Sequence, residues 1–141
     1  MALHRDPIRD LAFNPVRRDQ LLSGGQDRCV KLTNVSSCAE IMKWQLDSEA
    51  WAVCWNADDP EQFFVGTKRS KILLFDTRES GLDPAKELEF PVVERRPVIG
   101  LAYVKRDNRS VFPVGGLLVL TLGSLWFFEN DAARGYRDAI Q

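Results

Sequence analysis

The only histidine of the chain, His4, could form a hydrolytic site with a serine and an aspartate that follow it. Ser23 supplies a hydroxyl that a histidine base can activate, and Asp27 supplies a carboxylate that can orient the imidazole. The alternative is a buried hydrogen-bond network in which the three side chains hold neighbouring strands together. We favour the structural network for His4, Ser23 and Asp27, because all three occupy positions of a repeated pattern. We therefore expect no catalytic residue here.

Three cysteines are the other candidate nucleophiles and metal ligands. Cys29, Cys38 and Cys54 are nine and sixteen residues apart, which fits neither a paired disulfide framework nor close-spaced zinc ligands. Activation of a thiol requires a nearby base or an electropositive environment, and nothing in the sequence marks one. We expect a reduced, intracellular chain with a buried, inert Cys54, no metal site and no cofactor.

Glycine pairs and aromatic residues offer two further chemistries. Gly24-Gly25 and Gly115-Gly116 could cradle a phosphate, but neither completes a GxGxxG motif or a P-loop, so we expect turn glycines with positive φ. Several aromatic side chains could stack on nucleic-acid bases, although repeated positions favour packing between sheets, most strongly for Trp55 and Phe127. The full set is Trp51, Trp55, Trp126, Phe127 and Phe128.

Composition bounds the possible functions of this chain of 141 residues. It has 19 Lys and Arg against 20 Asp and Glu, a net charge of -1, which argues against a strongly basic nucleic-acid domain or an acidic tail. With 45% hydrophobic and 10% aromatic residues, the chain can bury a core. No apolar stretch approaches the roughly 20 residues that span a bilayer, so we expect no membrane segment.

A repeat of 42 residues organises the chain. A shift of 42 superposes two sets of residues whose small, apolar, aromatic or polar class is nearly always retained. A third copy begins at a shift of 90 and resumes at 95 to 96, with the extra residues in the loop 105–114. The first two sets are Ile8, Leu11, Phe13, Asn14, Leu22, Gly24, Val30, Leu32, Asn34 and Ala50, Val53, Trp55, Asn56, Phe64, Gly66, Ile72, Leu74, Asp76.

Each copy alternates apolar and other residues over short segments that end in turn residues, as strands do. The first copy predicts four strands, at 8–13, 20–23, 29–33 and 40–45. Four short strands in a period of about 40 to 45 residues are typical of a propeller blade. We therefore predict an all-β fold with blades at 4–45, 46–90 and 91–130, followed by a connector or tail at 131–141.

The first copy resembles a WD40 repeat. The resemblance is carried by His4, by Ile8-x-x-Leu11-x-Phe13-Asn14-Pro15, by the run 21–27 and by Val30-Lys31-Leu32. It implies that His4, Ser23 and Asp27 form the family's structural network, in which Thr33 replaces the tryptophan donor. The terminal Trp-Asp pair is replaced by Thr33-Asn34, Phe75-Asp76 and Phe128-Glu129.

Three blades do not close a circle, because a propeller has about four to eight of them. An arc of three leaves two blade faces and a strand edge uncovered. We therefore expect this chain to form part of a larger propeller of about seven blades.

A finer similarity is to the C-terminal propeller of the RING-finger and WD-repeat E3 ubiquitin ligases. It is carried by Val30-Lys31-Leu32-Thr33, Trp51-x-x-Cys54-Trp55, Pro97-Val98-x-x-Leu101-x-Tyr103, Phe112-Pro113-x-Gly115-Gly116-x-Leu118-x-x-Thr121-Leu122 and Phe127-Phe128-Glu129. The resemblance implies a nuclear ligase that acts at stalled forks and in DNA interstrand cross-link repair, where the propeller recruits the single-strand DNA-binding protein complex.

The chain has no Cys/His series with RING spacing. Any contact with a ubiquitin-conjugating enzyme would therefore require a RING in a longer product, and this segment would supply recognition. Two alternatives remain: a WD40 scaffold subunit of an unrelated intracellular complex, and direct binding of single-stranded DNA, which the net charge of -1 disfavours.

A basic cluster marks the predicted partner face, where the loop entering each first strand meets the turn between the second and third strands. Such a cluster would receive acidic protein segments or phosphates, whereas the simpler interpretation is a solvated rim. Its members are Lys68, Arg69, Lys71, Arg95 and Arg96. The opposite face carries both signs and is the second choice: Arg17, Arg18, Asp58, Asp59, Glu61, Lys105, Arg106 and Arg109.

Overall fold

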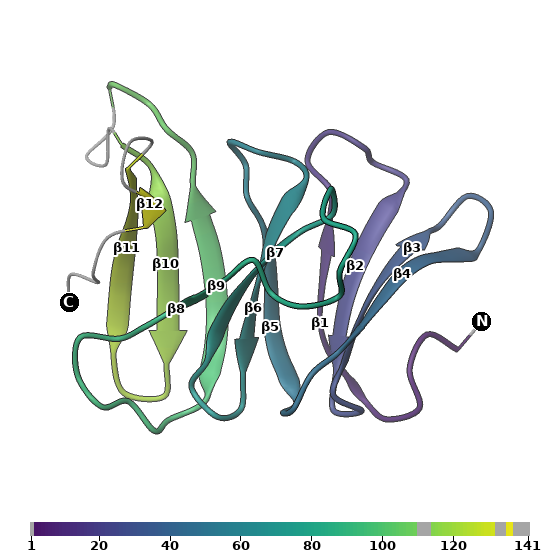
Figure 1. The fold of residues 1–141 in the computed structure, drawn as a ribbon, viewed down its shortest axis with the longest axis horizontal. Coiled ribbons are helices and arrows are strands. Elements are labelled where there is room, and N and C mark those ends of the chain that lie inside the picture. Colours follow the sequence, from purple (N-terminus) through teal and green to yellow (C-terminus); the bar gives the residue numbers. More distant parts are fainter. Residues whose placement is uncertain (1, 110–113, 132–134, 137–141) are drawn as a thin grey trace.

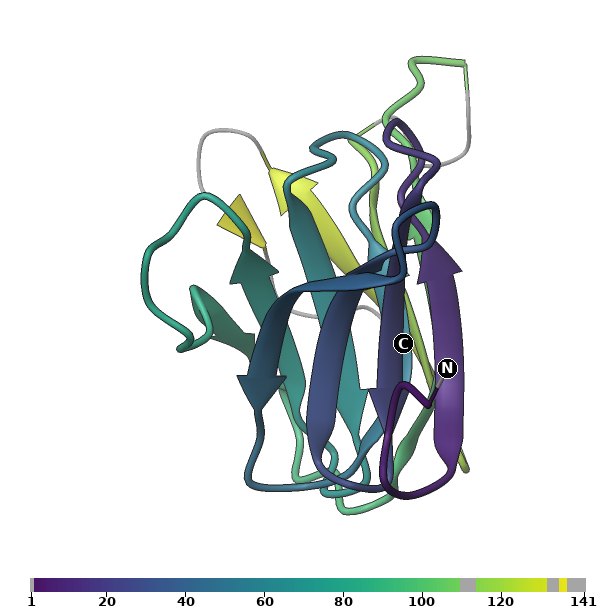
Figure 2. The ribbon, with the colours of Figure 1, turned by 90° about the vertical axis from the view of Figure 1, so that its right-hand side faces the viewer.

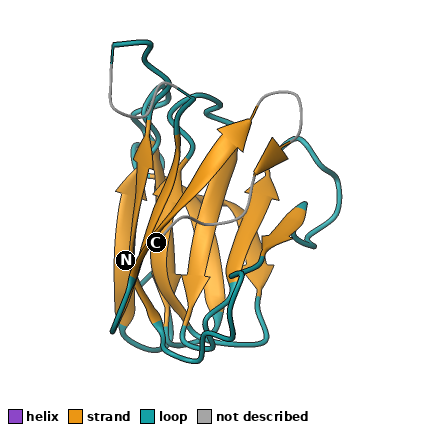
Figure 3. Cartoon of the chain, turned by 90° about the vertical axis from the view of Figure 1, so that its left-hand side faces the viewer, coloured by secondary structure: helices purple, strands orange, loops and turns teal. Residues whose placement is uncertain are grey.

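A computed structural model describes residues 2–109, 114–131 and 135–136, and for 131, 135 and 136 it describes the backbone alone. The prediction of an all-β fold is confirmed, because every regular element in these ranges is a strand (Figure 3). None of the described segments is a helix that could cross a membrane. Phe112 and Pro113 of the sequence motif, and 132–134 and 137–141 of the predicted connector, lie outside the described residues.

Within the described residues, twelve strands form three antiparallel sheets that lie side by side (Figure 1). In each sheet the strands follow one another in chain order. The first sheet contains β1 (Ile8–Phe13), β2 (Gln20–Gly25), β3 (Cys29–Asn34) and β4 (Ala39–Gln45); the second, β5 (Ala50–Trp55), β6 (Gln62–Thr67), β7 (Ile72–Asp76) and β8 (Lys86–Leu88); the third, β9 (Val98–Val104), β10 (Gly116–Thr121), β11 (Leu125–Asp131) and β12 (Gly135–Tyr136).

The strands of the first sheet match the predicted segments to within two residues. The third sheet runs further than the predicted blade, because β11 includes Asp131 and the backbone of Gly135 and Tyr136 pairs with it as β12. The first strands of the sheets, β1, β5 and β9, lie next to one another along the inner side of the arc. The sheets therefore stack as wedges, with the first sheet foremost in Figure 2.

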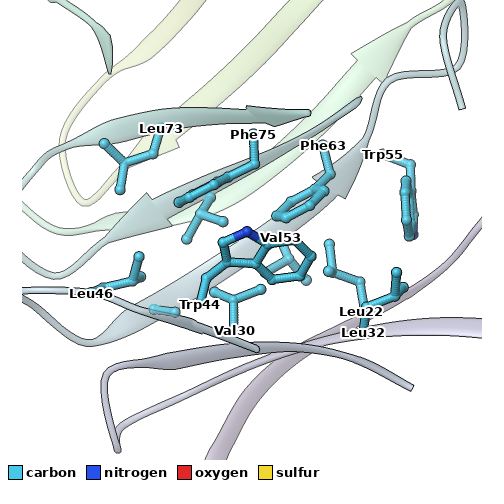
Figure 4. Close-up of a cluster of buried hydrophobic side chains, with 12 residues drawn as sticks. Leu22, Val30, Leu32, Trp44, Leu46, Val53, Trp55, Phe63, Leu73 and Phe75 are labelled. Carbon is cyan, nitrogen blue, oxygen red and sulfur yellow. The ribbon is translucent and has the colours of Figure 1, made fainter. Parts of the chain in front are cut away.

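Apolar side chains fill the junction between the first two sheets (Figure 4). Trp44, 1% exposed, contacts the ring of Phe63 edge-on at a centroid distance of 4.9 Å and lies 5.8 Å from that of Phe75. Phe63 and Phe75 stack on each other at 5.2 Å. We name this junction the first seam; the first sheet supplies Leu22, Val30, Leu32 and Trp44, and the second supplies Val53, Trp55, Phe63, Val65, Leu73 and Phe75.

A second seam joins the middle sheet to the third. Phe64 stacks on Tyr103 at 6.0 Å, and Phe90 contacts Trp126 edge-on at 5.6 Å. Successive residues of a strand point to opposite faces, so Phe63 enters the first seam and its neighbour Phe64 enters the second. The middle sheet is thus buried on both faces, which explains why β6 and β7 are almost continuously apolar.

Side-chain hydrogen bonds tie the first two sheets together where no backbone ladder joins them. The carboxylate of Asp10 accepts the Val53 N–H at 3.0 Å, beside an irregularity in the pairing of β5. The indole N–H of Trp55 donates to the Ala12 carbonyl at 2.9 Å. Without these bonds, each N–H group would be buried in the seam with no hydrogen-bond partner.

One of the two glycine pairs differs from the prediction of turn glycines. Gly115 has φ of 73°, as expected of a turn glycine, but Gly24 and Gly25 lie in β2 and neither has a positive φ. A Cβ at Gly24 would lie 3.0 Å from Ala50 Cβ, and one at the equivalent Gly66 would lie 2.3 Å from Val98 Cγ1. These two positions are glycine because the inner strand of the next sheet approaches closely.

The outer face of the first sheet carries more polar side chains than the faces packed in the seams. Ser23, Lys31 and Thr33 occupy the positions of Val65, Leu73 and Phe75 in the 42-residue repeat. The Lys31 ammonium donates to the carbonyl of Leu3, so the N-terminal segment covers part of this face. Phe13 remains 60% exposed, although its equivalents Trp55 and Tyr103 both contact a preceding sheet.

The first seam predicts the effect of removing its largest side chain. Trp44→Ala should lower the free energy of unfolding of the 141-residue chain by about 3–5 kcal/mol, because the deleted ring leaves a cavity between the sheets. Urea denaturation followed by circular dichroism measures this change. The control Val93→Ala removes a side chain that is 84% exposed and should change the stability by less than about 0.5 kcal/mol. Equal losses for both variants would contradict the packing described above.

Candidate functional site

His4, Ser23 and Asp27 form one hydrogen-bond network. The His4 Nδ1 lies 2.9 Å and 3.0 Å from the two carboxylate oxygens of Asp27, and its Nε2 lies 2.8 Å from the Ser23 hydroxyl. An ionised carboxylate only accepts hydrogen bonds, so Nδ1 carries the proton and, in the neutral ring, Nε2 accepts from Ser23. Ser23 thus directs its proton at the histidine, as a triad serine does.

Burial distinguishes this network from a hydrolytic site. Ser23 is 0% exposed and the His4 side chain is also 0% exposed, so no substrate reaches the hydroxyl. Asp27 also accepts the backbone N–H groups of Arg5 and Cys29. The three side chains therefore fasten the segment before β1 to the turn between β2 and β3, and this geometry matches the structural interpretation.

The network lacks the tryptophan donor that the WD40 pattern places at Thr33. The Thr33 hydroxyl is buried and has no hydrogen-bond partner among the residues that the structure describes. Burial raises the pKa of Asp27, but the hydrogen bonds from His4 and from the Cys29 and Arg5 N–H groups outweigh it and leave the pKa below its ordinary value. The carboxylate therefore stays ionised at neutral pH without help from Thr33.

The thiols offer little reactivity. Cys54 is partly exposed rather than fully buried as predicted. Desolvation still raises the pKa of its thiol to about 11, so the thiol stays protonated at neutral pH and is a poor nucleophile. Burial and the nearby Asp27 carboxylate also raise the pKa of Cys29. Cys38 is exposed. In the described ranges no three His, Cys, Asp or Glu side chains group together as metal ligands would.

The predicted partner face lies along the lower edge of Figure 1. There the turn after β2 touches the segment before β1 through the hydrogen bond from Gln26 N to Pro7 O at 3.0 Å. The equivalent bond in the middle sheet runs from Lys68 N to Glu49 O, also at 3.0 Å. The prediction that these two kinds of loop share a face is confirmed. We name it the loop face.

The two lysines of the predicted cluster are already paired. The Lys68 ammonium lies 3.0 Å from the Glu49 carboxylate, and that of Lys71 lies 3.1 Å from Asp47. Both pairs are partly exposed to water, so each contributes little to stability. They nevertheless neutralise the lysine charges, so the positive charge of the cluster that has no ion pair in the described part of the chain belongs to its arginines.

Arg95 and Arg96 project from a loop that Glu94 anchors. One oxygen of the Glu94 carboxylate accepts the N–H groups of Arg95 and Arg96, at 3.0 Å and 2.9 Å. The other accepts the Ser124 hydroxyl at 3.1 Å. The Arg96 N–H is the main cause that holds the pKa of Glu94 below its ordinary value. The Ser70 hydroxyl also donates to the Arg96 carbonyl, so the loop is fixed to two turns.

A groove of 480 Å³ crosses the loop face between the sheets. It brings together Arg69 and Arg95 of the predicted cluster, and it adds Arg28, which the sequence analysis missed. Arg28 follows Asp27 in the turn between β2 and β3, where its φ is 63°. Because the sequence already placed Asp27 in this turn, the adjacent Arg28 could also have been placed on the loop face. The lining residues are Arg28, Asp47, Ser48, Glu49, Lys68, Arg69, Glu94 and Arg95.

A second hollow of 360 Å³ adjoins the groove and shares Glu94 and Arg95 with it. Val92 and Val93 form its apolar side and are 57% and 84% exposed. The guanidinium of Arg96 lies over Gly123, where any side chain would collide with it. Arg96 therefore packs against the turn between β10 and β11, and Lys71 is absent from the lining of both hollows.

Charges on the opposite face largely satisfy one another. Arg17 pairs with Glu61, and Arg78 pairs with both Asp59 at 2.7 Å and Asp76 at 2.6 Å. The Asp58 carboxylate accepts the hydroxyl of Tyr103 and the backbone N–H of Arg106. Arg18, Lys105 and Arg109 are exposed there. These three cations do not gather in one hollow of the described structure, whereas the loop face brings three arginines together in one groove and is therefore the better candidate for binding.

The aromatic residues pack within the sheets. The prediction that Trp55 and Phe127 are core residues is confirmed, because they are 5% and 6% exposed, and Trp126 and Phe128 are also buried. Trp51 differs: its ring lies under the Arg9 guanidinium at 4.1 Å, and its buried Nε1 has no hydrogen-bond partner. None of these rings except that of Trp51 is available to stack on a base.

Comparison with known families agrees with the geometry. The family model for the WD40 domain of the E3 ubiquitin-protein ligase RFWD3 matches residues 1–140. The chain is 32% identical over 127 residues to that ligase from Ailuropoda melanoleuca and 31% identical over 128 residues to the one from Homo sapiens. These alignments cover 90% and 91% of the chain.

The same alignments cover only 16% of each ligase, so the chain spans about a sixth of their length. A WD-40 repeat-containing protein, MSI4 of Arabidopsis thaliana, is 29% identical over 80 residues, which cover 54% of the chain and 16% of that protein. The similarity therefore extends beyond ligases to another WD40 protein.

The Asp27 carboxylate predicts a pH-dependent contribution to stability. Asp27→Asn should lower the free energy of unfolding by about 1–3 kcal/mol at pH 7, because His4 and two backbone N–H groups lose a charged acceptor. The folded-state pKa lies below 3.8, so this contribution is complete above the unfolded-state pKa and is lost as the pH falls through the folded-state value. Urea titrations at pH 7 and pH 3 should show the difference shrinking, while the exposed control Asp83→Asn changes little at either pH.

The hydrogen bonds to Glu94 predict that this carboxylate keeps the loop of Arg95 and Arg96 ordered. Glu94→Ala should reduce the protection of the Arg95 and Arg96 amides from hydrogen exchange by about tenfold, because both lose their acceptor. Exchange followed by nuclear magnetic resonance at constant pH measures this loss. Glu79→Ala, an exposed control in another loop, should leave both amides unchanged. Equal protection in wild type and Glu94→Ala would show that the carboxylate does not hold the loop.

Proposed function

Because the chain belongs to the RFWD3 WD40-domain family, we propose that it recruits a macromolecular partner to a RING-type E3 ubiquitin ligase through its loop face. Protein interaction is the role that WD40 membership supports. The proposed partner is the single-strand DNA-binding protein complex at stalled forks, and the proposed setting is interstrand cross-link repair in the nucleus. Recruitment acts by proximity, since tethering raises the concentration of a target near the catalytic end.

The observation that carries this proposal is the difference between the two loop-bearing faces. On the loop face, three arginines line a groove and make no ion pair within the described part of the chain. On the opposite face, arginines occupy the described carboxylates of Asp59, Asp76 and Glu61, and the hollow there is lined by one cation, Arg18. A surface with unsatisfied charge and a hollow is the better site for a partner.

Ubiquitin transfer would be performed outside these residues, because the sequence contains no RING-type Cys/His series. Sequencing the complete transcript tests this part of the proposal. An in-frame RING series upstream would support it. A complete transcript without one would favour the second candidate, a WD40 scaffold of an unrelated complex, which the similarity to MSI4 also supports.

The binding role is tested by charge reversal in the full chain. Arg95→Glu combined with Arg96→Glu should weaken capture of the single-strand DNA-binding protein complex by at least about tenfold, because two exposed cations become anions on the proposed face. Quantitative pull-downs at low and moderate salt measure the change. The matched control reverses Arg18 and Arg109 on the opposite face and should bind as the wild type does.

Two results would contradict the proposal. Equal capture by the wild type and the Arg95/Arg96 variant would remove the loop face as the binding surface. Binding to naked single-stranded DNA with a steep salt dependence, in the absence of protein partners, would favour direct nucleic-acid binding instead.

A further inference from the structure

Three arginines from three different loops converge on the groove of the loop face. Arg28 lies in the turn between β2 and β3, Arg69 in the turn between β6 and β7, and Arg95 in the link between β8 and β9. Two sheets and the entry to the third therefore each contribute one guanidinium. We name these residues the arginine trio. It shares only Arg69 and Arg95 with the basic cluster predicted from the sequence.

The carboxylates that line the groove are already engaged. Asp47 pairs with Lys71 and Glu49 pairs with Lys68, at 3.1 Å and 3.0 Å. Glu94 accepts backbone and hydroxyl hydrogen bonds from its own loop and from Ser124. The arginine trio makes no ion pair within the described residues. Glu94 keeps its negative charge, because its partners are neutral donors, so the lining holds four cations against three carboxylates: Arg28, Lys68, Arg69 and Arg95 against Asp47, Glu49 and Glu94. The groove thus carries a small excess of positive charge, although the chain as a whole has a net charge of -1.

Hydrogen bonds hold the backbone beneath each arginine. The Arg28 carbonyl accepts the Leu46 N–H at 2.8 Å, and the turn that carries Arg69 is closed by the bond from Thr67 N to Lys71 O at 2.9 Å. The Arg95 N–H is bound by Glu94 at 3.0 Å. The guanidinium groups therefore extend from fixed points, which lowers the entropy cost of binding an anion.

An apolar shelf adjoins the arginine trio. Val92 and Val93 flank the second hollow, which shares Arg95 with the groove, and both are more than half exposed. Exposed aliphatic residues beside unpaired arginines favour a protein ligand, because a nucleic-acid backbone offers no aliphatic side chain to such a shelf. Arginine also pairs with carboxylates in a two-pronged geometry that lysine cannot provide.

We propose that the loop-face groove binds an acidic peptide segment, whose carboxylates pair with Arg28, Arg69 and Arg95 and whose apolar side chain lies on Val92 and Val93. This inference rests on the proposed function and names the chemistry of the partner. It assigns the lysines and Arg96 a secondary role, because Lys68 and Lys71 are paired and Arg96 packs over Gly123.

Fluorescence anisotropy of the full chain with a labelled twelve-residue peptide tests the proposal. The probe contains aspartates and glutamates on both sides of one leucine. Arg28→Ala, Arg69→Ala and Arg95→Ala should each weaken its binding by about tenfold, and the leucine-to-serine peptide should also bind more weakly. Arg18→Ala, which removes an exposed arginine from the opposite face, is the matched control and should bind as the wild type does. Arg69→Lys and Arg95→Lys keep the charge and should still weaken binding.

Several results would overturn the inference: no binding of the acidic probe, equal affinity for all arginine variants, or equal affinity for a peptide with lysines in place of its acids. Tighter binding of a single-stranded oligonucleotide of the same charge would also overturn it. Thermal unfolding verifies that the variants, all at exposed positions, remain folded.

A separate pull-down distinguishes this inference from the proposed function. Undiminished capture of the single-strand DNA-binding protein complex by the Arg28/Arg69/Arg95→Ala triple variant would leave recruitment of that complex standing and refute the groove as its binding site. Failure of the wild type to capture that complex, together with arginine-dependent binding of the acidic peptide, would refute the proposed partner and retain the groove.

Discussion

The structure depends on a middle sheet whose strands β5, β6 and β7 pack against a neighbouring sheet on both faces. Its alternate residues fill two different seams, so Phe63 and Phe64, adjacent in sequence, stabilise contacts with two different sheets. The hydrophobic effect is the main favourable term in such packing. The loops that form the groove are attached to strands held by these seams, and their relative positions follow from the stacking of the three sheets.

Much of the fold could be predicted from the sequence because one spacing recurs. A shift of 42 relates Asn14 to Asn56, and both use their side-chain oxygen to accept N–H groups two and three residues later. It relates Arg28 to Ser70, and both have positive φ. The same backbone conformation therefore recurs where the side chains differ completely. The glycines in β2 were harder to interpret, since the close approach of Ala50 is a tertiary contact that local sequence does not encode.

The candidate site was predicted only in part, for a similar reason. The sequence placed Arg69 and Arg95 on the loop face because the repeat fixes which loops emerge there. It did not reveal that Asp47 and Glu49 neutralise the lysines, because these ion pairs join loops rather than equivalent repeat positions. Arg28 was missed because its equivalent is an uncharged serine. The His4 network was easier to recognise, since its members belong to a family pattern and a buried histidine needs partners on both nitrogens.

The stacking of sheets built from consecutive strands determines how local unfolding spreads along the arc. Each sheet pairs strands that are consecutive in the chain, so its own ladder can form early, whereas the junctions require two completed sheets. Opening of either outer sheet breaks one junction and leaves the other two sheets associated. Unfolding of the middle sheet breaks both seams. We therefore expect the outer sheets to unfold locally first, and the whole arc to unfold cooperatively only when the middle sheet unfolds.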